Sequence, residues 1–196
     1  TRLDKVSRHA TESHPDVVTS FLESLPEDPD HPHRLRNTST RLNVLSRLDE
    51  AILLNNALLD TRSKRKLGIP EHLQAPARTR AFLVQTETDF DRVITADIME
   101  AFGLVKVSYI PNQTWLVRLH PDQLPRLKNL AGVRAVIPYA PYFKISEALL
   151  ERAADQLDLD RGTMLRLTSY PGEGTQTRSA LVSMGVDVLH QSTSPF

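Results

Sequence analysis

Hydrophobic residues between positions 80 and 139 change their period several times, and this alternation constrains the fold more than any other feature of the sequence. Short stretches with the spacing of strands are separated by two stretches with the spacing of helices. They predict, in chain order, a strand at 81–86, a helix at 95–102, strands at 105–110 and 114–119, a helix at 121–130 and a strand at 133–137. Gly103 is expected to end the first helix, and Pro111-Asn112 to form the turn between the second and third strands.

The order strand, helix, strand, strand, helix, strand is that of the ferredoxin-like fold. We therefore expect an α+β protein in which residues 80–145 form a four-stranded antiparallel sheet with both helices on one face. The opposite face of the sheet would be free, and it is the surface on which we expect a partner to bind.

Residues 39–66 are predicted to form a long amphipathic helix. The apolar residues that lie three or four positions apart are Leu42, Leu45, Leu48, Ile52, Leu53 and Leu59. Thr38, Ser39 or Thr40 would cap its start, whereas Asn55 and Asn56 interrupt its apolar stripe. The basic residues at 62–66 would lie at the negative end of the helix dipole, with a nucleic-acid patch or a basic cleavage site as the alternative.

Residues 1–38 are rich in His, Pro, Asp and Ser, and the prolines forbid a continuous helix, so this region is predicted to be an irregular N-terminal extension. His31 and His33, close to Asp28 and Asp30, carry groups that can bind a metal. They lack the HExxH spacing and a rigid scaffold. We therefore predict no metal site here and no cofactor.

The pattern of the first module begins again at 162–196. Residues 164–168 match 81–85, and residues 181–188 match 99–107, with Gly185 in the place of Gly103. The match predicts strands at 163–168 and 186–191 and a helix at 176–184, which together make the first half of a second similar module. Because a lone βαβ fragment leaves its sheet edge and helix face uncovered, we expect another chain or residues beyond Phe196 to complete it.

Composition excludes several functions. Lys and Arg together number 24, as do Asp and Glu, so no net charge attracts nucleic acid. No apolar run approaches the roughly 20 residues that span a bilayer. The absence of cysteine excludes disulfides and thiol catalysis. Gly172-Glu173-Gly174 is explained as a turn and not as a phosphate-binding loop. His120 and His190 could each act as a general base, but neither has a nucleophile in a recognisable catalytic motif. We therefore expect a chain without catalytic activity of its own.

Three stretches carry a resemblance to a known family: 109–118, which begins Tyr-Ile-Pro-Asn, 124–130, and 132–145, which contains Val-Ile-Pro-Tyr. They resemble the N-terminal prosegment of bacterial subtilisin-like serine proteases, and 165–191 resembles the start of the tandem module that follows it. The resemblance covers residues 80–196. The family's catalytic elements, an Asp-containing strand, a His-Gly-Thr-His segment and a Gly-Thr-Ser-Met-Ala segment, do not occur in this sequence.

The resemblance implies a propeptide that serves as folding template and then as inhibitor of a catalytic domain, from the same precursor, in a secreted or cell-envelope bacterial protease. The tail Thr193, Ser194, Pro195 and Phe196 would bind that enzyme, with the aromatic ring in its primary specificity pocket, and Trp115 would be the main side chain of the interface. The alternative is a structural adaptor subunit whose half module is completed by another chain. A third reading is a domain that senses a small molecule.

Overall fold

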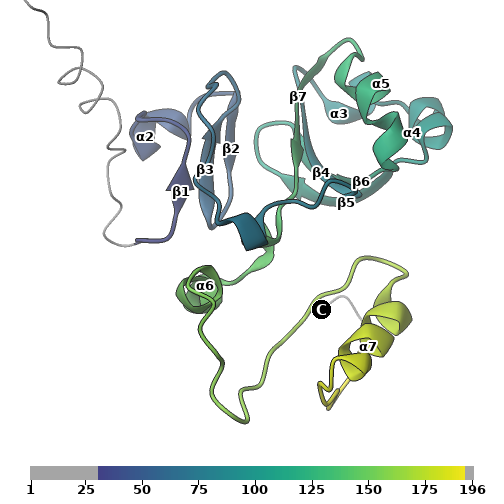
Figure 1. The fold of residues 1–196 in the computed structure, drawn as a ribbon. Coiled ribbons are helices and arrows are strands. Elements are labelled where there is room, and N and C mark those ends of the chain that lie inside the picture. The colour runs from purple at the N-terminus through teal and green to yellow at the C-terminus, as the bar shows by residue number, and fades with distance from the viewer. Residues whose placement is uncertain (1–30, 193–196) are drawn as a thin grey trace, which may run out of the picture.

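The computed structural model describes residues 31–192 and shows a mixed α+β protein with two sheets (Figure 1). The N-terminal sheet has the order β1-β3-β2, formed by Leu35–Arg36, Ala57–Asp60 and Ala51–Leu53. The second, four-stranded sheet has the order β5-β6-β4-β7, formed by Val105–Ile110, Thr114–Arg118, Ala81–Thr86 and Val133–Pro138. The expected α+β class is confirmed.

The four-stranded sheet is antiparallel at every pairing. Its central strand β4 is buried along its whole length, because β6 and β7 flank it and both of its faces are covered. Pro111, Asn112 and Gln113 connect β5 to β6, since Ile110 pairs with Thr114. Asn112 and Gln113 have positive φ angles of 64° and 54°. All four strands predicted between 81 and 137 are confirmed, to within one residue at each end.

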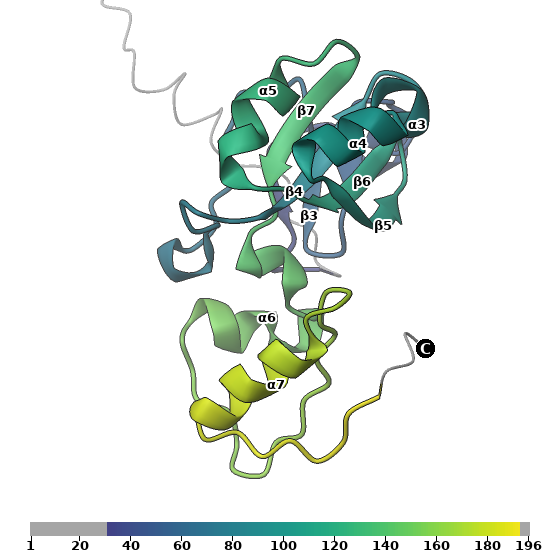
Figure 2. The same cartoon turned by 90° about the vertical axis from the view of Figure 1, so that its right-hand side faces the viewer.

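Three helices cover one face of this sheet (Figure 2). They are α3, Phe90–Val93, α4, Ala96–Phe102, and α5, Leu124–Lys128, which follows a 3-10 turn at Pro121–Gln123. Phe82 and Val84 of β4 point into the core beneath them, together with Val117 of β6. The sequence predicted α4 and α5 but not the single turn α3, which Asp89 caps by accepting a hydrogen bond from the amide of Asp91 (2.9 Å).

Gly103 ends α4 in the left-handed conformation, with φ at 58°. Replacing it with Ala should lower the free energy of unfolding by about 1 kcal/mol, because a Cβ disfavours this φ even though it would meet no atom within 4 Å. Urea denaturation would measure the change. Gly68→Ala is the matched control, since Gly68 is equally uncrowded and does not need a positive φ. Equal effects of the two substitutions would contradict this account.

The long helix predicted at 39–66 is wrong. Only α2, Leu42–Leu45, is helical, and β2 and β3 follow it as an antiparallel hairpin in which Leu53 pairs with Leu58. Asn55 and Asn56 form the turn, across which the amide of Leu54 donates to the carbonyl of Ala57 (2.8 Å). Short continuous apolar runs are compatible with a buried helix and with a strand buried on both faces, so their spacing did not distinguish the two.

The basic stretch at 62–66 therefore does not lie at a helix end. Arg62 instead pairs with the carboxylate of Asp60 at the end of β3 (2.8 Å). The predicted N-terminal extension is also only partly irregular, because Leu35–Arg36 pairs in parallel with β3. Residues 1–30 lie outside the described part of the chain.

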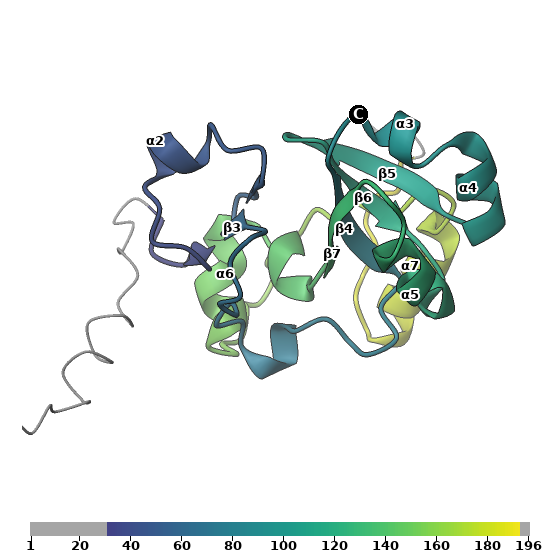
Figure 3. The ribbon, with the colours of Figure 1, turned by 90° about the horizontal axis from the view of Figure 1, so that it is seen from above.

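The sheet face opposite the helices is covered, which corrects the expectation that it is free. Ile52 and Leu59 of the N-terminal hairpin pack on Leu83 and Leu116, and all four are buried. Seen from above in Figure 3, the N-terminal strands lie on one side of the four-stranded sheet and the helices on the other. The apolar stripe at 39–60 covers this face as a hairpin, so the first module and its N-terminal region share one core.

Residues 139–192 follow as a turn, two helices and extended chain. The 3-10 turn Pro141–Lys144 buries Tyr142 and Phe143, and α6, Glu147–Ala154, packs beside it through Leu150. The helix predicted at 176–184 is present as α7, Gly174–Ser183. The strands predicted at 163–168 and 186–191 are wrong, since neither stretch pairs with a strand among residues 31–192.

Candidate docking site

Trp115 forms a surface cluster with Phe90, Lys106 and Tyr109, which we name the Trp115 cluster. The ring centroids of Trp115 and Tyr109 are 5.5 Å apart in an edge arrangement, and those of Trp115 and Phe90 are 5.8 Å apart. Tyr109 stands opposite Trp115 across the β5–β6 pairing and is 53% exposed. The cluster thus presents one exposed tyrosine above a half-buried tryptophan.

A cation completes this cluster. The Nζ of Lys106 lies 4.3 Å from the centroid of the Trp115 ring and 2.6 Å from a carboxylate oxygen of Asp91. The carboxylate fixes the ammonium above the ring, where the electron-rich aromatic face attracts it. An arrangement of exposed aromatic and charged groups is typical of protein interfaces, in which aromatic side chains supply much of the binding free energy.

Of the predicted binding residues, Trp115 lies among those the structure describes, and Thr193, Ser194, Pro195 and Phe196 lie outside them. Trp115 points to the helix-covered side of the sheet, where it packs on the buried core. It does not face the surface expected to bind a partner. The sequence did not single out Lys106 or Tyr109, although their position on β5, next to Trp115 on β6, follows from the predicted hairpin.

A buried polar junction fixes the N-terminal sheet to the four-stranded sheet. The amide nitrogen of Gln85, which is fully buried, donates to the carbonyls of Asp49 (3.0 Å) and Asn112 (3.0 Å). Its amide oxygen accepts from the hydroxyl of Thr61 (2.9 Å). Asn112 in turn donates to the carbonyl of Ala51 (2.9 Å). Sequence reasoning missed this junction, and its only sequence signal was a glutamine inside an otherwise apolar strand.

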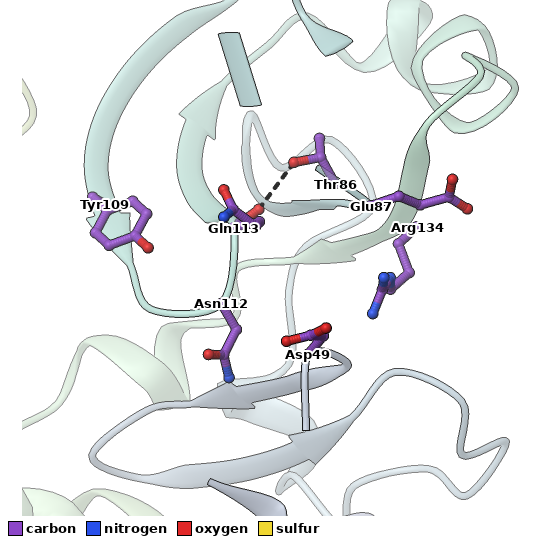
Figure 4. Close-up of a pocket in the computed structure, with 7 residues that line it drawn as sticks. All are labelled: Asp49, Thr86, Glu87, Tyr109, Asn112, Gln113 and Arg134. Carbon is purple, nitrogen blue, oxygen red and sulfur yellow. Dashed lines mark hydrogen bonds between the residues drawn. The ribbon is translucent and has the colours of Figure 1, made fainter. Parts of the chain in front are cut away.

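A polar cavity of about 280 Å³ opens beside this junction, at the end of the four-stranded sheet (Figure 4). Figure 4 shows Asn112 pointing from the β5–β6 turn toward the N-terminal sheet, with Thr86 and Gln113 at the other end of the cavity. Arg134 contributes a cation, held 3.4 Å from the carboxylate of Glu50. The cavity is lined by Asp49, Thr86, Glu87, Tyr109, Asn112, Gln113 and Arg134. Because Asp49, Asn112 and Arg134 of its lining make contacts between the two sheets, we interpret it as part of the junction.

The turn before α7 is anchored on the first module. Arg118 of β6 pairs with the carboxylate of Glu173 (2.6 Å), and its guanidinium lies 4.4 Å from the centroid of the Tyr170 ring. Lys144 approaches the rings of Tyr170 (5.6 Å) and Tyr139 (5.8 Å) from the other side. Residues 170–173 therefore contact β6 and the turn after β7 through two cations and two aromatic rings.

Burial shifts the pKa values of three groups in this anchor, and a hydrogen bond shifts that of a fourth. Burial, with a smaller contribution from the nearby Arg118 charge, lowers the pKa of Lys144. Burial raises the pKa of both Tyr139 and Tyr170. The hydrogen bond from Arg118 lowers the pKa of Glu173, so this carboxylate stays ionised at every pH above the ordinary glutamate pKa.

Acidification should release the turn at 170–173. Because the pKa of Glu173 is lowered in the folded state, the stability gained from the pair is fully present above the ordinary glutamate pKa. It is lost as the pH falls through the lower, folded-state value. The protection of the amides in residues 170–174, measured as the observed exchange rate relative to the intrinsic rate at the same pH, should fall over that range. Glu173→Gln should exchange fast already at neutral pH, and protection in this variant equal to wild type would contradict the role of the pair.

Two of the histidines lie next to a carboxylate. His31 lies 2.6 Å from a carboxylate oxygen of Glu147, and His120 lies 3.2 Å from that of Asp122. His190 is exposed. Among residues 31–192 no group of three or more His, Cys, Asp or Glu side chains is placed to hold a metal ion. In the same range, none of the helices has the length and apolar character that crossing a membrane requires.

The fold and the site thus define an α+β protein with a four-stranded antiparallel sheet, a smaller mixed sheet and a cation–aromatic cluster. Comparison with protein-family models, with curated proteins and with solved structures finds no significant match to the chain.

Proposed function

We propose that this chain is a non-catalytic, propeptide-like segment of a subtilisin-like serine protease, and that it acts as folding template and then as inhibitor of the catalytic domain. The observation that carries the proposal is that the two longer stretches of the resemblance belong to one sheet. Residues 109–118 contribute the β5–β6 hairpin, and residues 132–145 contribute β7 and the turn after it.

We further propose that the four-stranded sheet and its helices are a ferredoxin-like module. The strand order β5-β6-β4-β7 and the position of α4 and α5 on one face support this assignment. A small rigid module of this kind suits a folding template, because it can present a preformed surface to a catalytic domain that folds slowly.

Docking is proposed at the β5 edge, since the other sheet face is occupied by the N-terminal hairpin. Strand β5 is one of the two outer strands and pairs only with β6 among the described residues. Val105 and Tyr109 are each 53% exposed along it. An outer strand with exposed apolar side chains can bind a partner by backbone pairing and side-chain packing together. In this arrangement the Trp115 cluster lies at the margin of the interface.

Inhibition of a protease tests the proposal. The full chain would be titrated into the subtilisin-like protease encoded with it, or into a general subtilisin, while hydrolysis of a peptide substrate ending in Pro-Phe is followed. We expect tight inhibition. Deletion of Phe196 should weaken it if the tail occupies the specificity pocket, and Tyr109→Ala should weaken it by about tenfold if the β5 edge docks.

Val44→Ala is the matched control for Tyr109→Ala, because Val44 has a similar exposure of 49% but lies on α2 of the N-terminal region. It should leave inhibition unchanged. Failure of the wild-type chain to inhibit the cognate protease would overturn the proposed function. If Tyr109→Ala inhibited the protease as strongly as the wild-type chain, the proposed function would be retained and docking through the β5 edge would be excluded.

A structural adaptor is the second candidate. The observation that favours it is the high exposure of apolar side chains after α6, among them Met164 at 80% and Leu189 at 78%. Apolar surface of this extent marks interaction sites in soluble proteins. A stable stoichiometric complex that contains no protease would support this candidate.

A further inference from the structure

The sequence repeat in the C-terminal region extends to backbone geometry. Both α4 and α7 are followed by a glycine with positive φ, 58° at Gly103 and 80° at Gly185. In each case the glycine amide donates to the carbonyl three residues back, and the next amide donates to the carbonyl five residues back. The pairs are Gly103–Glu100 (3.0 Å) and Leu104–Met99 (2.8 Å) after α4, and Gly185–Val182 (3.0 Å) and Val186–Leu181 (3.0 Å) after α7. The end of α7 thus has the same backbone geometry as the end of α4, and residues 163–191 correspond to β4, α4 and β5 in sequence.

The two repeats within the chain differ in the burial of their apolar side chains. Residues that form the core of the first module correspond to exposed residues in the second. The exposed fractions are 1% for Phe82 against 47% for Leu165, 0% for Val84 against 58% for Leu167, 8% for Phe102 against 68% for Met184, and 4% for Leu104 against 46% for Val186. The second repeat therefore carries the residues of a core face that is 46% to 68% exposed.

Strand order explains why the counterpart strands stay unpaired. In the first module β4 and β5 are not neighbours, because β6 lies between them and pairs with both. If residues 163–168 take the position of β4 and residues 186–191 that of β5, a third strand must lie between them, as β6 does, before either can pair. No segment of residues 31–192 supplies it, so both stretches remain extended but unpaired.

The first module also shows what can fill that gap. Exchanging β4 with β6 and β5 with β7 gives the same strand order read from the opposite edge of the sheet. The module therefore consists of two βαβ halves, β4-α4-β5 and β6-α5-β7, which are related by a pseudo-two-fold axis. At the centre of the β4–β6 pairing, Leu83 stands opposite Leu116. One half of such a module is therefore complementary to another half of the same kind.

We propose that the occupant is a second copy of this chain, and that residues 163–191 of two copies form a four-stranded antiparallel sheet around a two-fold axis. The two 163–168 strands pair at the centre, and each 186–191 strand pairs with the central strand of the other copy. Leu165, Leu167, Met184 and Val186 of both copies then form the shared core under the two α7 helices. An interface of this isologous kind closes at two copies.

One charge opposes this pairing. Arg166 takes the position of Leu83, so the guanidinium groups of the two copies meet near the axis, where like charges directly opposite weaken a strand pair. The dimer should therefore tighten when Arg166 is replaced by Leu. Arg166→Leu should strengthen the association, whereas Leu167→Lys, at the next residue of the same strand, should abolish it. An interface elsewhere on the chain would not give these opposite effects.

Sedimentation velocity of the full chain over a range of concentrations tests the proposal. We expect a species of twice 22.1 kDa at high concentration. Leu167→Lys should leave the chain monomeric, and Arg166→Leu should lower the dissociation constant by about tenfold or more. The control for the first is Val44→Lys, on an equally exposed apolar residue of α2. The control for the second is Arg178→Leu, on exposed α7.

Cross-linking gives a readout of the register itself. Because the chain has no cysteine, Arg166→Cys provides one thiol per copy, and directly opposed residues in antiparallel strands have Cα atoms about 5.5 Å apart or closer. Mild oxidation should give a disulfide-linked dimer for Arg166→Cys but not for Arg178→Cys. A monomer at every concentration, or a dimer that tolerates Leu167→Lys, would overturn the proposal. The protease function proposed above does not enter these measurements.

Discussion

Replacing Ile52 with Ala is expected to lower the free energy of unfolding by about 3 kcal/mol. Ile52 is fully buried between the N-terminal hairpin and the four-stranded sheet, where it packs with Leu83 and Leu116. Truncation removes its apolar contacts and leaves a cavity in a core that two sheets share. The loss should therefore affect the whole of residues 31–139 in a single transition, and should not merely detach the hairpin.

Urea denaturation followed by Trp115 fluorescence would measure this effect, since Trp115 is the single tryptophan and lies on the other side of the sheet. Leu42→Ala is the control, because Leu42 belongs to the same region but is 43% exposed. It should change stability by less than about 1 kcal/mol. If Ile52→Ala had the same urea midpoint as the wild type, the N-terminal hairpin would not belong to the core whose unfolding Trp115 fluorescence follows.

The second large effect is expected from Gln85→Ala, at about 3 kcal/mol. The substitution leaves the carbonyl of Asp49 without its side-chain donor in a buried region. It also removes one of the two donors to the carbonyl of Asn112 and one of the two acceptors near the Thr61 hydroxyl. Leaving buried polar groups unsatisfied costs more than the net worth of the hydrogen bonds themselves. A cavity in place of the amide adds to the loss.

Gln176→Ala is the matched control for this variant, because Gln176 is an exposed glutamine on α7. Calorimetry of both variants would compare their unfolding midpoints, and only Gln85→Ala should shift. Gln85→Glu adds a sharper test, since a carboxylate offers no donor to the two carbonyls and at neutral pH places a charge in their midst. A wild-type midpoint in Gln85→Glu would contradict the donor role of Gln85.

The covered sheet face changes where a partner can bind. A free face would have offered a broad apolar surface on β4 and β6, but the N-terminal hairpin occupies it. What remains exposed is the β5 edge with Tyr109 and the apolar surface at 163–191. The two surfaces are proposed for different occupants, a protease domain and a second copy, so inhibition and self-association assays can address them separately.

Local signals were sufficient wherever each element is decided by its own residues. The apolar patterns at 81–86, 105–110 and 114–119 predicted strands, and Gly103 and Gly185 predicted the ends of two helices through their tolerance of positive φ. The helix that the repeat predicts at 176–184 could likewise be read from residues alone, and α7 confirms it. In these places backbone preference and burial favour the same conformation.

Tertiary structure decided the rest, for a common physical reason. The apolar residues at 51–60 suit a helix or a strand equally, and only the open face of the four-stranded sheet selects a hairpin that buries them on both sides. Residues 163–168 have strand character, yet a strand forms only when a neighbour accepts its hydrogen bonds, and none is present among residues 31–192. The sequence by itself determined which segments are apolar and where helices end, whereas pairing between distant segments determined which of them became strands.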